Sequence, residues 1–214
     1  MRLNGKVAWV IGGSSGIGAA VARELVCRGA TVAISARRKE QLHDVAGGDM
    51  LVLPADVTDA ASIAAVLPDM LRRHHGVIAG IASVAGYRGL AGSEAYGATK
   101  AAQINMLESL RVHIARTGVH VTTICPGFVR TDLTAGNPFP MPFIMEAGQA
   151  ARSICDGLER ERTEIAFPAA MALLMKTARL VPVRVWTALW KSTSRPDTRP
   201  AEHPGRDHRK QRTP

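Results

Sequence analysis

The stretch VAWVIGGSSGIG at residues 7–18 decides how the N-terminal half of the chain folds. Its apolar start, residues 7–11, predicts a buried strand, and a helical pattern follows at residues 19–27. The turn between them contains four glycines, namely Gly12, Gly13, Gly16 and Gly18. A strand, a glycine turn and a helix form a phosphate cradle, because glycines let the backbone approach a diphosphate and the helix N-terminus presents free N–H groups. The G-x-x-x-G-x-G spacing therefore indicates a dinucleotide site.

The same residues also fit the G-x-S-x-G nucleophile elbow of α/β-hydrolases, in which Ser14 would attack an ester. An elbow normally follows several strands, whereas this turn follows the first, and the elbow gives Gly18 no role. A turn without any ligand is also disfavoured, because the four glycines cost conformational entropy. We prefer the dinucleotide interpretation and keep an esterase as an alternative.

Length and composition limit the class of protein. The chain has 214 residues, a formal net charge of +9 and three cysteines. We expect one domain over residues 1–190 and a disordered basic tail over residues 191–214, without specific nucleic-acid binding. No apolar run is long enough to span a membrane, and the N-terminus enters a strand without a signal peptide. Three separated cysteines predict buried thiols in a reducing compartment, so a cytoplasmic location is expected. The histidines lack metal-ligand spacing, and no metal site is expected.

Apolar runs and helical patterns alternate along the chain. Further strands are expected at residues 30–36, 50–54, 77–83, 119–125 and 163–167, and helices at residues 40–45, 60–74, 93–116 and 147–160. Such alternation predicts an α/β fold with a doubly wound parallel sheet that helices cover on both faces.

Two arginines, Arg37 and Arg38, follow the second expected strand. In a dinucleotide-binding fold this position faces the adenosine ribose. An acidic residue there would bind the ribose hydroxyls of NAD, whereas an arginine pairs with a 2′-phosphate. NADP is therefore favoured over NAD as the cofactor.

The ordered motifs resemble those of the classical short-chain dehydrogenase/reductase family over roughly residues 5–170, a family with a Rossmann-type fold. The resemblance is carried by Gly12, Gly16 and Gly18, by Asp56 and Val57 in ADVTD, by Ser83 in ASVAG, by Tyr96 and Lys100 in YGATK, and by Pro126, Gly127 and Thr131 in PGFVRTD. It implies an NAD(P)-dependent oxidoreductase that interconverts a ketone or aldehyde and an alcohol by hydride transfer. It also implies cofactor contacts from Ser14, Ser15, Ile17 and Val129.

The same resemblance assigns roles to three catalytic residues. Tyr96 and Lys100 are four residues apart and share a helix face. A nearby ammonium stabilises a phenolate, so that Tyr96 can exchange a proton with the substrate oxygen. Ser83 would hydrogen-bond the same oxygen, and Lys100 would also hold the ribose hydroxyls. In the family, Asp56 and Val57 lie beside the adenine, and the PGFVRTD residues line the nicotinamide end.

The chain departs from the family between Thr58 and Val77, where the family has a helix, a central strand and a second helix that carries a catalytic asparagine. Only a short segment stands here, and no asparagine occurs between Asn4 and Asn105. We expect an internal deletion that joins near Val66, with Pro68 kinking a fused helix. Either the Ser83 strand moves beside the first strand, or the sheet keeps a gap with unpaired edges, and both outcomes weaken activity.

The C-terminal part is apolar. Residues 169–190 carry apolar residues at helical spacing with interspersed basic ones, which fits a helix packed on its own core, a lid, or an in-plane helix at a membrane surface. The loop at residues 138–143 is rich in proline and phenylalanine and matches the family's substrate loop. Together they favour a small hydrophobic carbonyl or alcohol substrate. The resemblance implies a homodimer through the Tyr96 helix. The alternative is a catalytically inactive nucleotide-binding or membrane-associated protein.

Overall fold

The computed structural model describes residues 1–36, 38–53, 67–136 and 140–191. The sequence predictions for Arg37, Asp56, Val57 and the tail lie outside these described residues. The chain divides into two compact units, Met1–Leu180 and Val181–Pro214. The expected division at residue 190 stays a prediction.

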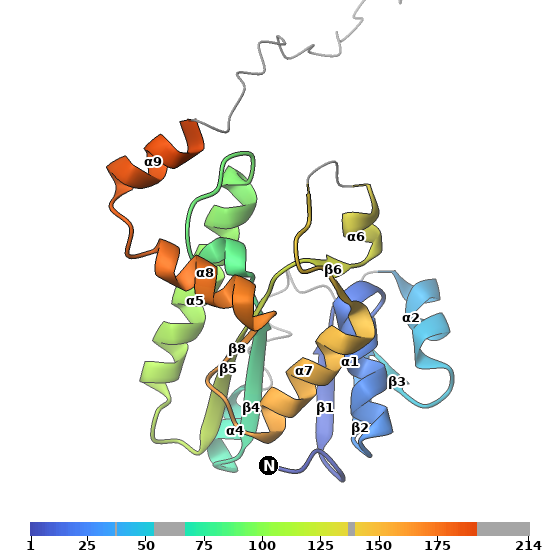
Figure 1. The fold of residues 1–214 in the computed structure, drawn as a ribbon. Coiled ribbons are helices and arrows are strands. Elements are labelled where there is room, and N and C mark those ends of the chain that lie inside the picture. Colours follow the sequence, from blue (N-terminus) through green and yellow to red (C-terminus); the bar gives the residue numbers. More distant parts are fainter. Residues whose placement is uncertain (37, 54–66, 137–139, 192–214) are drawn as a thin grey trace, which may run out of the picture. The chain divides into compact units, whose positions relative to one another are not determined.

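The N-terminal half of the first unit is a three-stranded parallel sheet in the order β1-β2-β3 (Figure 1). Its strands are β1 (Val7–Ile11), β2 (Thr31–Ser35) and β3 (Leu51–Val52). Helices α1 (Gly16–Cys27) and α2 (Lys39–Ala46) connect them, since parallel neighbours need a crossover. These elements confirm the expected ones: β1 has the expected bounds, and β2 and β3 are shorter than expected.

A second parallel sheet, ordered β4-β5-β8, forms the other half. Its strands are β4 (Gly76–Ile81), β5 (Val119–Pro126) and β8 (Glu164–Phe167). Helix α5 (Glu94–His113) connects β4 to β5, α7 (Ala147–Glu159) precedes β8, and α4 (Leu67–Arg72) precedes β4. Strand β5 is almost entirely buried because it pairs on both sides. The fold is a Rossmann-type α/β fold.

Among the described residues, no strand pairing joins the two sheets, and we call the interval between β1 and β4 the gap. Strand β1 pairs only with β2, and β4 pairs only with β5, so no strand among the described residues lies between them. Val7 is 82% exposed and Ile81 36% exposed, although both belong to strands that would be central in a continuous sheet. Strand β4 therefore does not take a place beside β1 among the described strands, and the deletion itself stays a prediction.

Two helices join the halves in place of strand pairing. Helix α1 packs against α7, and one hydrophobic core contains side chains from β2, α1, α7, β5 and β8. Arg28 at the end of α1 pairs with Asp156 and Glu159 of α7 at 2.7 and 3.0 Å, and with Glu24 of its own helix at 2.8 Å. Beside the gap, the Lys6 ammonium lies 3.2 Å from Nε2 of His75.

Several short elements were not expected from the sequence. They are the 3-10 helix η1 (Val84–Gly86), the paired strands β6 (Val129–Arg130) and β7 (Met145–Glu146), and α6 (Asp132–Ala135). Pro68 lies in the first turn of α4, where a proline is tolerated. The residues before it lie outside the described part, so the fused helix stays a prediction.

Two expectations for the C-terminal part and the thiols need correction. The helical pattern at residues 169–190 forms two helices, α8 (Ala169–Ala178) and α9 (Val183–Lys191), because Pro182 cannot continue a helix. Cys125 and Cys155 are buried as expected, but Cys27 is exposed at the end of α1. Burial raises the pKa of the Cys155 thiol to about 12, which keeps it protonated.

Candidate cofactor cradle and active site

The glycine turn forms a tight cradle at the N-terminus of α1. Gly12 and Gly16 have φ angles of +80° and +57°, which favour glycine. A Cβ on Gly18 would lie 2.2 Å from the carbonyl oxygen of Gly12, so only glycine fits there. Ser15 is the N-cap residue, and its side chain makes no capping hydrogen bond. The turn thus leaves its surface free of side chains and presents backbone N–H groups, as an anion site requires.

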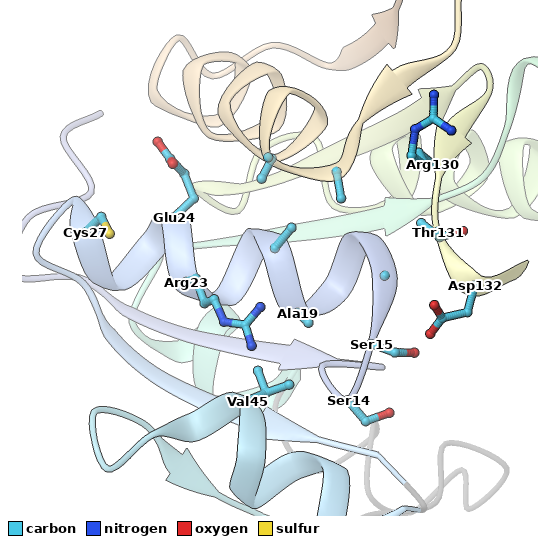
Figure 2. A pocket seen from close by; sticks show the side chains of 15 residues that line it. Ser14, Ser15, Ala19, Arg23, Glu24, Cys27, Val45, Arg130, Thr131 and Asp132 are labelled. Atoms are coloured by element: carbon cyan, nitrogen blue, oxygen red, sulfur yellow. The ribbon is translucent and has the colours of Figure 1, made fainter. Parts of the chain in front are cut away.

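An open pocket of about 570 Å³ begins at this turn and runs along α1 (Figure 2). Ser14 and Ser15 lie at one end of the pocket, with Asp132 and Thr131 on the segment beside them. Arg23, Glu24 and Cys27 follow along α1. The methyl group of Thr131 lies against Gly16, where an added Cβ would be 3.3 Å from it.

Arg38 extends from the end of β2 to the cradle. Its Nη2 atom donates to the hydroxyl oxygens of Ser15 at 3.0 Å and Ser14 at 3.4 Å. A guanidinium group therefore lies at the side of the glycine turn, where the sequence predicts a partner for a 2′-phosphate. Ile17 is partly buried and Val129 fully buried, and both pack in the main core.

Ser83 follows β4 and begins η1. Its side chain is buried, with the residue only 7% exposed. The hydroxyl donates to the carbonyl oxygen of Pro126 at 3.3 Å and accepts from the backbone N–H of Ala85 at 3.2 Å. Backbone partners on two elements thus fix the orientation of the Ser83 hydroxyl.

Tyr96 and Lys100 share one face of α5, as their spacing predicts. The Lys100 Nζ atom lies 5.7 Å from the centre of the Tyr96 ring, and Tyr96 is 47% exposed. The ammonium donates to the carbonyl oxygen of Ile81 at 3.1 Å and to Oε1 of Gln103 at 3.0 Å. Burial lowers the pKa of Lys100 below its ordinary value.

Two of the residues around these catalytic candidates were missed by sequence reasoning. Gln103 is three residues beyond Lys100, a spacing that places both on one helix face and was available as a signal. Tyr87 is buried, donates to Oε1 of Glu164, and lies with its ring centre 5.6 Å from Nζ of Lys176. Nothing in the local sequence links Tyr87 to Glu164, because the contact joins distant segments.

The candidate residues fall into two groups. One group surrounds the cradle and contains Ser14, Ser15, Gly16, Arg38 and Thr131. The other contains Ser83, Tyr96 and Lys100, none of which lines the pocket.

The short segment from Pro126 to Thr131 connects the two groups along the chain. Pro126 touches Ser83, and Thr131 touches Gly16. Gly127 donates its N–H to the carbonyl oxygen of Phe167 at 2.7 Å, which ties this segment to the end of β8.

Other chemistries find less support in the site. An esterase would need a base beside Ser14, yet no histidine of the described residues lines the pocket. Among the described residues, no three side chains of His, Cys, Asp or Glu come together as metal ligands.

A family model described as short chain dehydrogenase matches residues 6–67 and 60–138 of the chain. The chain belongs to the short-chain dehydrogenase family. The two matched pieces of the chain meet at residues 60–67, which include the site where the sequence places the join of the deletion.

Relatives of the chain include an uncharacterised oxidoreductase of Myxococcus xanthus, 46% identical over 132 residues. That match covers 61% of this chain and 52% of the relative, so the chain spans about half of that protein's length. A 2,5-dichloro-2,5-cyclohexadiene-1,4-diol dehydrogenase of Sphingobium indicum is 31% identical over 195 residues, covering 64% of this chain and 78% of the relative. A short-chain dehydrogenase structure from Burkholderia cenocepacia, in complex with NADP, has a TM-score of 0.75 at 22% identity and covers 88% and 98% of the two chains.

Proposed function

We propose that this protein is an NADP-dependent oxidoreductase that interconverts an apolar ketone or aldehyde and its alcohol by hydride transfer. The observation that carries the proposal is Arg38, whose guanidinium lies beside the glycine cradle in contact with Ser15. This position matches the place of a 2′-phosphate in a dinucleotide-binding fold. The NADP complex of the Burkholderia dehydrogenase supports the same cofactor.

The residues present fit this cofactor. A side chain at Gly18 would collide with the turn, so the cradle admits a diphosphate at the helix N-terminus. We propose that Arg38, Ser14 and Ser15 hold the adenosine phosphate end, and that Arg37, Asp56 and Val57 lie nearby. The remaining contacts would come from Gly12, Gly16, Ile17, Pro126, Gly127, Val129 and Thr131. The bound cofactor would supply the hydride.

The protein's own contribution would be orientation and proton transfer. In the reducing direction, Tyr96 would give its phenolic proton to the carbonyl oxygen, and in the oxidising direction its phenolate would take the alcohol proton. Lys100 lies beside the Tyr96 ring and would stabilise the phenolate. Ser83 would donate a hydrogen bond to the same substrate oxygen, which requires it to release Pro126.

Exposed apolar side chains in the C-terminal part support a hydrophobic substrate. Phe143, in the described part of the proline-rich loop, is exposed, as are Leu173 and Leu174 of α8. The Sphingobium relative is named for a chlorinated ring diol, which also has an apolar ring. We also propose a homodimer through α5, a cytoplasmic location, and membrane contact through residues 169–190. No described helix is long and apolar enough to cross a membrane.

The test is Tyr96→Phe, with NADPH consumption followed against a panel of hydrophobic ketones. The variant should lose carbonyl reduction and keep NADPH binding, because only the proton donor is removed. Tyr87→Phe is the matched control, since it removes the other of the two tyrosines. Unchanged turnover in Tyr96→Phe would refute the assignment of the acid.

The gap between β1 and β4 favours a second candidate, an inactive nucleotide-binding protein. Catalysis needs the Ser83–Lys100 group to face the cradle, and misplacement by about 1 Å costs about a hundredfold in rate. Binding of NADPH without reduction of any ketone in the panel would identify this second candidate.

A further inference from the structure

Helix α9 belongs to the second unit (Figure 1), and its sequence gives the helix two different sides. At about 100° per residue, the bulky apolar residues fall on one side of the helix. They are Val183, Val185, Trp186, Leu189 and Trp190. Arg184 and Thr187 fall on the other side. Val183, Val185 and Leu189 are 68%, 51% and 56% exposed, and exposed apolar side chains on one helix side are typical of an interaction surface.

The charged residues just before and within α9 are all basic. Residues 165–191 contain four basic residues, Lys176, Arg179, Arg184 and Lys191, and no acidic residue. The following residues 192–214 add six basic and three acidic residues. A partner that covers the apolar side of α9 therefore meets an excess of positive charge, and an anionic surface is complementary to it.

Two tryptophans lie one turn apart on the apolar side. Their rings meet edge to face, with centroids 5.9 Å apart and an angle of 66° between the ring planes. Tryptophan is enriched where an apolar phase meets water, because its ring is apolar and its indole N–H is polar. Aromatic and aliphatic residues opposite basic ones are typical of helices that lie in the plane of a membrane surface.

We propose that α9 binds a membrane surface rich in anionic phospholipid. Val185, Leu189 and the two tryptophans enter the boundary between headgroups and acyl chains, and Arg184 faces the lipid phosphates. The helix lies in the plane of the surface, since its nine residues are too few to span the bilayer. This deepens the membrane contact proposed for residues 169–190 and is independent of cofactor and substrate. An apolar substrate dissolved in the bilayer would then be near the enzyme.

Co-sedimentation of the full-length protein with vesicles tests the proposal. The vesicles consist of phosphatidylcholine alone or with about one third phosphatidylglycerol. We expect binding to the anionic vesicles at least about tenfold stronger than to phosphatidylcholine, and weaker with rising salt. On anionic vesicles, tryptophan emission should also move to shorter wavelength.

Two matched variants place asparagine on opposite sides of α9. Val185→Asn should lower anionic-vesicle binding about tenfold, whereas Thr187→Asn should change it by less than about twofold. Circular dichroism verifies that both variants fold. Equal effects of the two variants, equal binding to both vesicle types, or no vesicle binding at low salt would each overturn the proposal.

The same two variants distinguish binding of α9 to a membrane from packing of α9 on protein. If Val185→Asn lowers the unfolding temperature of the chain and leaves vesicle binding unchanged, α9 packs on protein, and the proposal is wrong. None of these experiments uses NADPH or a ketone. A failure of membrane binding therefore does not affect the oxidoreductase proposal, and a failure of carbonyl reduction does not affect the membrane proposal.

Discussion

At the scale of single residues, Lys100 takes a backbone partner at the open sheet edge. Carbonyl groups of a strand alternate between its two edges, and Ala82 donates its N–H to Ile124 of β5. The carbonyl of Ile81, one residue earlier, therefore points toward the gap, where the Lys100 ammonium binds it. Gln103 holds the same ammonium from α5. The candidate catalytic lysine thus also satisfies a carbonyl that a neighbouring strand would otherwise bind.

Arg38 carries the first residue-scale prediction. Arg38→Ala should weaken NADPH binding about 10- to 100-fold and change NADH binding by less than about twofold, because only NADPH has the 2′-phosphate. Fluorescence titration of the two cofactors measures both constants. Arg23→Ala, which alters another arginine of the same pocket, should affect both cofactors equally and slightly. Equal loss of both cofactors in Arg38→Ala would remove the basis for NADP preference.

At the scale of elements, the packing of α1 against α7 connects the two halves of the first unit, which strand pairing would otherwise connect. Arg28 is partly buried and binds carboxylates of both helices. Arg28→Ala leaves Glu24, Asp156 and Glu159 without this cation. We expect the free energy of unfolding to fall by about 2 kcal/mol, the range of a charge-assisted hydrogen bond lost inside a protein. Urea unfolding measures the loss, and a change below about 0.5 kcal/mol would mean that apolar packing alone holds the helices.

Three further elements meet at Glu164, which accepts from Tyr87 after η1 and from Lys176 of α8. Burial tends to raise the pKa of Glu164, but these two hydrogen bonds outweigh it and hold the pKa below its ordinary value of 4.5. A carboxyl with a depressed folded-state pKa stabilises the fold above its unfolded pKa, and that stability is lost as the pH falls through the folded value.

The expected result is a melting temperature that falls more steeply below pH 4.5 in the native protein than in Glu164→Gln. Calorimetry from pH 3 to 7 gives both curves. Parallel curves would show that Glu164 contributes nothing to the pH dependence. Burial also raises the pKa of Tyr87 above its ordinary value. At alkaline pH, ionisation of this phenol should therefore lower the melting temperature of the unsubstituted protein.

At the scale of the whole molecule, the sequence predicts the local elements well and their arrangement only in part. Periodicity located β1 and α1, and motif spacing placed Tyr96 beside Lys100. Pro182 could have predicted the break between α8 and α9. The sequence could not predict whether the sheet closes or keeps a gap. That outcome depends on strand pairing and on the packing of α1 against α7, and both are contacts between segments far apart in the sequence. For the same reason the contacts of Lys100 with Ile81 and of Tyr87 with Glu164 were missed.

The gap makes a prediction about hydrogen exchange. In a continuous doubly wound sheet the strands at the position of β1 and β4 would be central and pair on both sides. Among the described strands each pairs on one side, so alternate N–H groups of both strands face the gap. Mass spectrometry should find faster amide exchange in β1 and β4 than in β2 and β5, which pair on both sides. Equal protection of all four strands would show that another segment of the chain fills the gap in solution. That segment would then connect the Ser83–Lys100 group to the cradle.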